Sequence, residues 1–132
     1  MSKQAEPFYH PHYIMIPRTK LAEDSISDEA LDVVVEEEVE PTEEEFDYFE
    51  FTRKEEDELW IALFDEFKFE LNIMIGDCED EVIPRRLVPK AIAITREILG
   101  EGTPPTAQPA VRRVLAALEL ALSRNVSVLF AW

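Results

Sequence analysis

The sequence predicts an α+β fold in which about three amphipathic helices pack on a small sheet. Apolar residues recur at helical spacing in three segments that follow residue 53. Runs rich in β-branched and aromatic residues occur before residue 52 and again at residues 126–132. With 132 residues, 46% of them hydrophobic, the chain is long enough to bury one core, so we expect a single domain over residues 1–132.

The N-terminal part contains the candidate strands. Residues 13–16 are apolar and precede Pro17, which ends a strand. Residues 46–51 are aromatic enough to favour a strand, although strict alternation fails in their middle. Residues 31–39 combine a β-branched core with several glutamates, so strand and helix both stay open there. We expect residues 1–12 to be flexible.

The first predicted helix covers residues 54–75. Acidic residues at positions 55–58 fall in its first turns, where the helix dipole favours anions. Gly76 followed by Asp77 predicts its end. Its apolar residues form one helical stripe, which comprises Trp60, Leu63, Phe64, Phe67, Leu71, Met74 and Ile75.

Two further helices follow. The second begins at about residue 86 or 89 and ends at residue 99, before Gly100 and Gly102. The third covers about residues 109–123. Residues 126–132 then form a β-rich run, and because a lone strand leaves its backbone unpaired, we expect it to join the N-terminal strands in one sheet. The residues expected to face inward are Val88, Ala91, Ile92, Ile98 and Leu99 in the second helix and Val111, Val114, Leu115, Leu118 and Leu122 in the third.

Charge is the least ordinary property of the sequence. The net charge is −16, and residues 23–58 contain 18 acidic and two basic residues, which alone give −16. This acidic segment argues against a nucleic acid or an anionic membrane surface as the direct ligand, since both are themselves negative. A basic protein is the natural partner, because opposite fields steer the two molecules together.

Cysteine usage and hydropathy indicate the compartment. Cys78 is the single cysteine, so an intramolecular disulfide is excluded. The sequence shows neither a signal-peptide-like apolar run nor an apolar stretch of transmembrane length. We expect a cytoplasmic protein.

Catalytic and metal-binding patterns are weak. His10 and His12 could share one face of a strand as metal ligands do, but without a third ligand we expect a surface pair. Acidic neighbours of Cys78 disfavour a reactive thiolate. The stretch from Asp77 lacks the central Gly and final Glu of an EF-hand loop, and no glycine-rich phosphate motif occurs. We expect a protein that is not an enzyme, with no catalytic residue, no metal and no cofactor.

The acidic segment is the strongest candidate for binding. Its acids interleave with aromatic residues, which can anchor an interface. A solvated face that only maintains solubility explains the same pattern, and both interpretations stay open. An acidic turn at residues 77–81 is a second candidate. The predicted contact residues are Glu36, Glu37, Glu38, Glu43, Glu44, Glu45, Asp47, Tyr48, Glu50, Asp77, Glu79, Asp80 and Glu81.

Residues 64–84 and 88–94 carry a resemblance to a known group of proteins. They read as a helix with Asn72 near its end, an acidic turn, Ile83 with Pro84, and a second helix. This part of the chain resembles bacterial immunity proteins, which protect cells from toxins of contact-dependent growth inhibition and related secretion systems. The resemblance implies a small cytosolic inhibitor of a toxin domain, in many cases a nuclease, whose cationic groove would accept carboxylates in place of phosphates.

The expected function is therefore that of an acidic inhibitor, which neutralises a basic protein toxin by electrostatic complementarity. A phage-type nucleic-acid mimic that inhibits a host enzyme is one alternative. A non-catalytic adaptor or structural subunit is another, and an enzyme that uses carboxylates with a metal is a third. Whether the chain forms homo-oligomers stays open.

Overall fold

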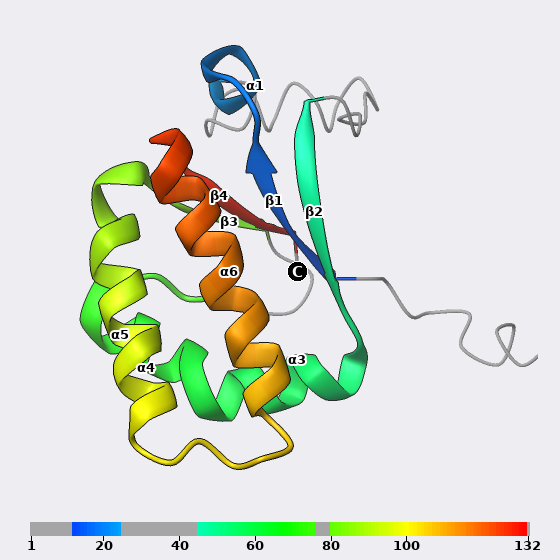
Figure 1. The fold of residues 1–132 in the computed structure, drawn as a ribbon, viewed down its shortest axis with the longest axis vertical. Helices are drawn as coiled ribbons and strands as arrows, with labels where there is room; N and C mark the ends of the chain where they lie inside the picture. Colours follow the sequence, from blue (N-terminus) through cyan, green and yellow to red (C-terminus); the bar gives the residue numbers. More distant parts are fainter. Residues whose placement is uncertain (1–11, 25–44, 76–79, 132) are drawn as a thin grey trace, which may run out of the picture.

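The computed structural model describes residues 12–24, 45–75 and 80–131, and these form an α+β architecture (Figure 1). Within these residues, four antiparallel strands build one sheet in the order β2-β1-β4-β3. The strands are β1 (His12–Pro17), β2 (Phe46–Phe51), β3 (Asp80–Ile83) and β4 (Val128–Ala131). The predicted fold class is confirmed, and so is the predicted pairing of the last strand with an N-terminal strand.

Strand register decides which side chains face the core. Tyr13 of β1 lies opposite Glu50 of β2 and Ala131 of β4, and Val82 of β3 lies opposite Leu129 of β4. Successive side chains of a strand point to opposite faces of the sheet. Ile14 and its partners in the neighbouring strands therefore point to one face, whereas Met15 and its partners point to the other.

The long helices lie on one side of this sheet (Figure 1). After β1 comes the short helix α1 (Lys20–Asp24). After β2, three helical segments follow without a break: α3 (Arg53–Leu59), the π-helical η2 (Trp60–Phe64) and α4 (Asp65–Leu71). After β3, the 3-10 turn η3 (Arg85–Leu87) leads into α5 (Val88–Gly100) and then α6 (Gln108–Arg124).

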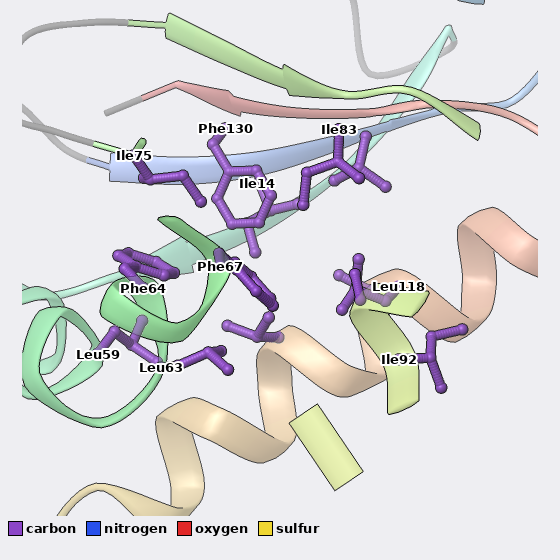
Figure 2. Packing of buried hydrophobic residues seen from close by; sticks show 14 of the residues in the cluster. Ile14, Leu59, Leu63, Phe64, Phe67, Ile75, Ile83, Ile92, Leu118 and Phe130 are labelled. Atoms are coloured by element: carbon purple, nitrogen blue, oxygen red, sulfur yellow. The ribbon is translucent and has the colours of Figure 1, made fainter. Parts of the chain in front are cut away.

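The main core lies between the inner face of the sheet and these helices. Ile14 and Phe130 from central strands are fully buried, and they meet Phe64 and Phe67 from the helices (Figure 2). The rings of Phe64 and Phe130 are 5.8 Å apart in an edge-to-face arrangement, which is favourable for aromatic pairs. Leu118 of α6 and Ile92 of α5 extend the same cluster. The outer face of the sheet carries a smaller buried cluster, which consists of Met15, Ala22, Phe46 and Leu129.

The first predicted helix is real but ends earlier than predicted. It ends at Leu71, because Asn72 takes a left-handed backbone conformation with φ 59° that stops the helix before Gly76. The predicted inward stripe is wrong at Trp60, which is 43% exposed, and at Met74, which lies past the helix end and is 49% exposed. The π-helical turn η2 explains the first error, because its extra residue per turn shifts the stripe and buries Leu59 instead.

The second and third predicted helices correspond to α5 and α6 within one or two residues at each end. Leu122 is the exception to the predicted inward set, since it is half exposed in the last turns of α6. Two elements were not predicted: the helix α1 and the strand β3. The predicted element at residues 31–39 and the predicted flexible residues 1–11 lie outside the described residues, whereas His12 begins β1.

None of the helices in the described part of the chain combines the length and the apolar character needed to cross a membrane.

Candidate functional site

The predicted contact residues are only partly described. Glu45, Asp47, Tyr48 and Glu50 belong to β2 or immediately precede it, and Asp80 and Glu81 belong to β3. The other seven, which lie outside the described residues, are Glu36, Glu37, Glu38, Glu43, Glu44, Asp77 and Glu79.

The two described acidic sets lie at opposite edges of the sheet. Two strands, β1 and β4, separate β2 from β3. At about 4.8 Å between neighbouring strands, the two edges are roughly 14 Å apart. Of the predicted acidic turn, Asp80 and Glu81 lie in the strand β3, in which Glu81 pairs with Phe130, and residues 77–79 lie outside the described residues. The fold therefore does not merge the two predicted sets into one surface.

Asp47 is occupied by contacts within the protein. Arg18 donates a hydrogen bond of 3.0 Å to its Oδ1, and Arg124 lies 2.6 Å from its Oδ2. The hydrogen bond from Arg18 lowers the pKa of Asp47 below its ordinary value of 3.8, burial opposes this, and Arg124 lowers the pKa further. Because two guanidinium groups already neutralise this carboxylate, Asp47 offers little charge to a partner.

The remaining β2 residues form a smaller candidate surface, which we name the β2 surface: Glu45, Tyr48 and Glu50. Glu45 and Glu50 are exposed. Tyr48 is half-buried, and its ring packs edge-to-face on Tyr13 with the centroids 5.7 Å apart. Tyr48 thus has the partly exposed aromatic character of an anchor, although it also contributes to the outer cluster of the sheet.

A more concentrated acidic site lies on the helical side of the molecule. A groove of about 530 Å³ runs between the η2–α4 stretch and the C-terminal half of α5. We call it the acidic groove, because five carboxylates line it and, among the described residues, no Lys or Arg does. The carboxylates are Asp65, Glu66, Glu70, Glu97 and Glu101.

Helical spacing places these carboxylates together with apolar side chains. Ile94, Glu97 and Ile98 follow the spacing 0, 3, 4 along α5, so they share one face, and Glu101 directly follows the helix as its C-terminal cap. Ile94 is buried and Ile98 is half-buried, so both lie deep in the groove. From the opposite wall, Ile61 contributes an apolar side chain that is 86% exposed.

A hydrogen-bonded turn forms one end of the groove. Gly102 adopts a φ of 89°, which favours glycine, and lets the chain leave α5 sharply. The Thr103 hydroxyl donates a hydrogen bond of 2.7 Å to the carbonyl of Ile98, and the Gln108 side chain donates one of 3.0 Å to the carbonyl of Thr103. These bonds tie the turn to both α5 and α6.

Charge in the groove is not compensated by the residues that the structure describes. Within residues 12–24, 45–75 and 80–131, none of the ion pairs includes any of its five carboxylates; the arginines pair instead with acids such as Glu55 and Glu119. Glu70 lies in the last turn of α4 and Glu97 in the last turn of α5, where the negative end of the helix dipole disfavours a carboxylate. The groove thus concentrates negative potential that the fold itself does not use.

Aromatic and aliphatic side chains lie beside this charge. Trp60 and Ile61 of the π-helical turn line a shallow hollow with Asp65, and both Ile61 and Asp65 also line the acidic groove. Aromatic side chains such as tryptophan are enriched at the cores of protein interfaces, which a polar rim surrounds. π-Helical turns also occur frequently at functional sites.

The acidic groove was missed in the sequence because its acids are few and far apart along the chain. One signal was present. Glu66 and Glu70 are four residues apart in α4, and Glu97 of α5 is four residues from Glu101, which directly follows that helix. Like charges at this spacing destabilise a helix, so two such repeats facing each other indicate a role other than stability.

The predicted surface pair of histidines is wrong at His12, whereas His10 lies outside the described residues. His12 is only 7% exposed, and its Nδ1 lies against Oε2 of Glu56, which is also buried. Cys78 is outside the described residues. In the described part of the chain, no three His, Cys, Asp or Glu side chains gather as a metal site would require.

No protein-family model matches the chain, and no curated protein or solved structure matches it either.

Proposed function

We propose that this protein is an acidic inhibitor, which binds a basic protein toxin and neutralises it by electrostatic complementarity. The observation that carries the proposal is the acidic groove: five carboxylates, without a cation from the described residues, beside the exposed side chains of Trp60 and Ile61. The β2 surface is a second region that the same partner could contact.

The physical argument rests on what a partner would supply. Carboxylates four residues apart repel each other, and this repulsion is relieved when lysine or arginine side chains lie between them. The apolar side chains of the groove lose contact with water in the same step. Binding therefore gains free energy from groups that lower the stability of the free protein.

Among basic proteins, a nuclease can supply the lysine and arginine side chains that the groove requires. Its substrate groove must be cationic, because it binds a phosphate backbone. Carboxylates can occupy such a groove in place of phosphates, since both accept hydrogen bonds from arginine and lysine. The net charge of −16 would also accelerate the encounter with a cationic partner.

The first test is to identify the partner. The tagged protein is expressed in its native host and purified at low and at high salt, with and without added nuclease. We expect one basic, nuclease-like protein that is lost at high salt but retained after nuclease treatment, and whose toxicity is suppressed when both proteins are co-expressed. Recovery of a host nucleic-acid-processing enzyme would support the nucleic-acid mimic instead. Recovery of no basic protein at either salt concentration contradicts the inhibitor function.

A second test separates the two surfaces. The variant Glu66→Lys with Glu97→Lys changes the groove, and Glu45→Lys with Glu50→Lys changes the β2 surface by the same amount of charge. We expect the groove variant to weaken binding of the recovered toxin by at least about a hundredfold, as the loss of close charge pairs implies. The β2 variant should weaken it by less than about tenfold, mainly through slower association. The reverse order would place the interface on the β2 surface.

A further inference from the structure

We infer that the acidic groove recognises a basic amphipathic α-helix of its partner. The apolar stripe of that helix would pack on the isoleucines of the groove, and lysines or arginines on both sides of the stripe would pair with the acids of the two walls. This inference rests on the proposed function, because it names the recognition element for the same site.

The arrangement of charge is the first reason. Asp65, Glu66 and Glu70 come from one wall, whereas Glu97 and Glu101 come from the other. Between these walls, the buried Ile94 and the half-buried Ala62 and Ile98 form the floor where the two helical stretches meet. A ligand that matches this cross-section has an apolar centre and a cationic flank on each side.

The length of the groove is the second reason. Its lining extends from Ile61 to Glu70 on one wall and from Ile94 to Glu101 on the other. At about 1.5 Å per helical residue, these walls are roughly 13 Å and 10 Å long. That length fits about two turns of a helix, enough for two or three apolar residues at spacings of three and four.

The backbone of the walls is the third reason. Peptides that bind by extending a sheet need unpaired backbone N–H and C=O groups along an exposed strand. Both walls here are helical, so most of their backbone groups are already paired within each helix. Recognition must therefore depend on side chains, which is how an amphipathic helix binds in a groove.

Other occupants fit the groove less well. A second copy of the chain would bring another net charge of −16 to a surface that is already acidic. A nucleic acid would be repelled in the same way. The occupant that fits the groove is therefore a cationic, helical segment of a protein.

The test uses a synthetic peptide of about 18 residues, made of leucine and lysine with the leucines at helical spacing. A scrambled peptide of the same composition and charge serves as the control. Binding is measured by calorimetry and by the fluorescence of Trp60 in a Trp132→Phe background, where Trp60 is the single tryptophan. We expect the amphipathic peptide to shift the Trp60 emission and to bind at least about tenfold more tightly than the scrambled peptide.

Two variants and a matched control locate the peptide. Ile61→Ser removes an exposed apolar side chain of the groove, and Glu66→Gln with Glu97→Gln removes one charge from each wall. We expect each change to weaken peptide binding by about tenfold, and the control Phe69→Ser, which alters an apolar side chain that is 74% exposed but does not line the groove, to leave it unchanged within about twofold. Circular dichroism of each variant verifies that the fold is retained.

Three results would overturn the inference. Equal binding of the scrambled peptide would show that charge alone drives the contact. Equal binding by the Ile61→Ser and wall variants would place the peptide elsewhere. A dimer of the free chain in light scattering, abolished by the Glu97→Gln change, would make a second copy the occupant.

The groove inference and the proposed function can fail independently of each other. If the protein neutralises a basic toxin whose affinity is unaffected by Ile61→Ser and by the wall variants, the inhibitor function stands and the groove inference fails. If the peptide binds in the groove but no basic toxin is recovered from the host, the recognition mode stands and the toxin assignment fails.

Discussion

Arg113 joins three parts of the chain at one point near the start of α3. Its guanidinium donates hydrogen bonds of 3.0 Å to each oxygen of Glu55 and one of 3.1 Å to the carbonyl of Glu50. It also lies 5.0 Å from the centre of the Phe51 ring. Glu55 in turn accepts a hydrogen bond from the backbone of Thr52 and so completes the capping box of α3. One partly buried corner of the protein thus depends on a single charge pair.

A pH-dependent loss of stability follows from this pair. Burial raises the pKa of Glu55, but the hydrogen bonds from Arg113 and Thr52 outweigh burial and lower the pKa below 4.5. A carboxyl whose folded pKa is lowered stabilises the fold above its unfolded pKa, and this contribution disappears as the pH falls through the folded pKa. We expect Glu55→Gln to lower the free energy of unfolding by about 1 kcal/mol at pH 7.

Urea denaturation of both proteins at pH 7 and near pH 3 measures this effect. The difference between them should shrink at the lower pH, because the wild-type carboxyl is then increasingly protonated. A difference that stays constant or grows at low pH would contradict the lowered pKa.

The contact between His12 and Glu56 gives a second prediction. Both side chains are buried at the end of the sheet nearest α3. Removal of one member leaves the other buried without this partner, so Glu56→Ala should destabilise the protein by about 2–4 kcal/mol. The neighbouring exposed residue offers a control, since Asp57→Ala should change stability by no more than about 0.5 kcal/mol. Equal effects of the two variants in thermal denaturation would refute a stabilising role of the pair.

Contacts of single residues are what the sequence predicts least well. His12 was expected at the surface, because its partner Glu56 is 44 positions away and nothing local indicates the contact. Asp47 was predicted to bind a partner, yet it meets Arg18 and Arg124, which come from distant parts of the chain. Long-range pairing of charges is a property of the tertiary structure and leaves little trace in local patterns.

Among the elements, α4 and α6 end in the same way. Asn72 and Asn125 follow them with φ values of 59° and 58°. Asparagine tolerates this left-handed conformation, glycine tolerates it better, and residues with an ordinary side chain resist it. The two asparagines therefore act as the stop signals that glycine supplies in many other helices.

Substitution of these asparagines tests their role. We expect Asn72→Ala and Asn125→Ala each to lower the free energy of unfolding by about 1 kcal/mol, whereas Asn72→Gly and Asn125→Gly should leave it unchanged or raise it slightly. Urea denaturation of the four variants measures the difference between each Ala and Gly pair. If the Ala and Gly variants at one site are equally stable, the left-handed conformation there does not limit stability.

Periodicity in the sequence predicted the elements better than it predicted single contacts. Both α5 and α6 match their predicted ranges, because each is amphipathic over its whole length and flanked by glycine or proline. The predicted apolar stripe of the first helix fails at η2, because a π-helical turn contains about one residue more than the α-helical turn that the prediction assumes. The strand β3 was not predicted, because it begins in an acidic run that favours neither a strand nor a helix.

At the scale of the whole molecule, the net charge is expected to affect stability through self-repulsion. A net charge of −16 on 132 residues implies strong self-repulsion at low ionic strength. Salt screens this repulsion over a distance of about 10 Å at 0.1 M. We expect the melting temperature to rise by about 2–5 °C when NaCl is increased from about 10 to 150 mM.

The variant Glu66→Gln with Glu97→Gln serves as a comparison for this salt effect. It removes two uncompensated charges from the acidic groove, so its melting temperature should be higher at low salt and should rise less on addition of NaCl. Scanning calorimetry of both proteins over the same salt series is the measurement. A melting temperature that falls with salt would mean that internal ion pairs outweigh the repulsion.

The sequence predicted the acidic character of the molecule but not the place where it is concentrated. The acidic segment was visible because its residues are contiguous. The acidic groove depends instead on how the η2–α4 stretch packs beside α5, which brings together residues up to 43 positions apart, from Ile61 to Pro104. Helical spacing could place Glu97 beside Glu101, but only the packing of helices on the sheet sets them opposite Asp65 and Glu66.

The order of strands in the sheet has a consequence for synthesis. Although β4 follows all other described elements in the sequence, it lies between β1 and β3 and is the only strand that β3 pairs with in the described part of the chain. During translation, β1 and β2 can meet early, but among the described strands β3 has no neighbour until residues 128–131 have left the ribosome. A nascent chain whose residues 128–131 are still inside the ribosome would therefore expose the apolar inner face of an unfinished sheet, and closure of the core must wait for this late insertion.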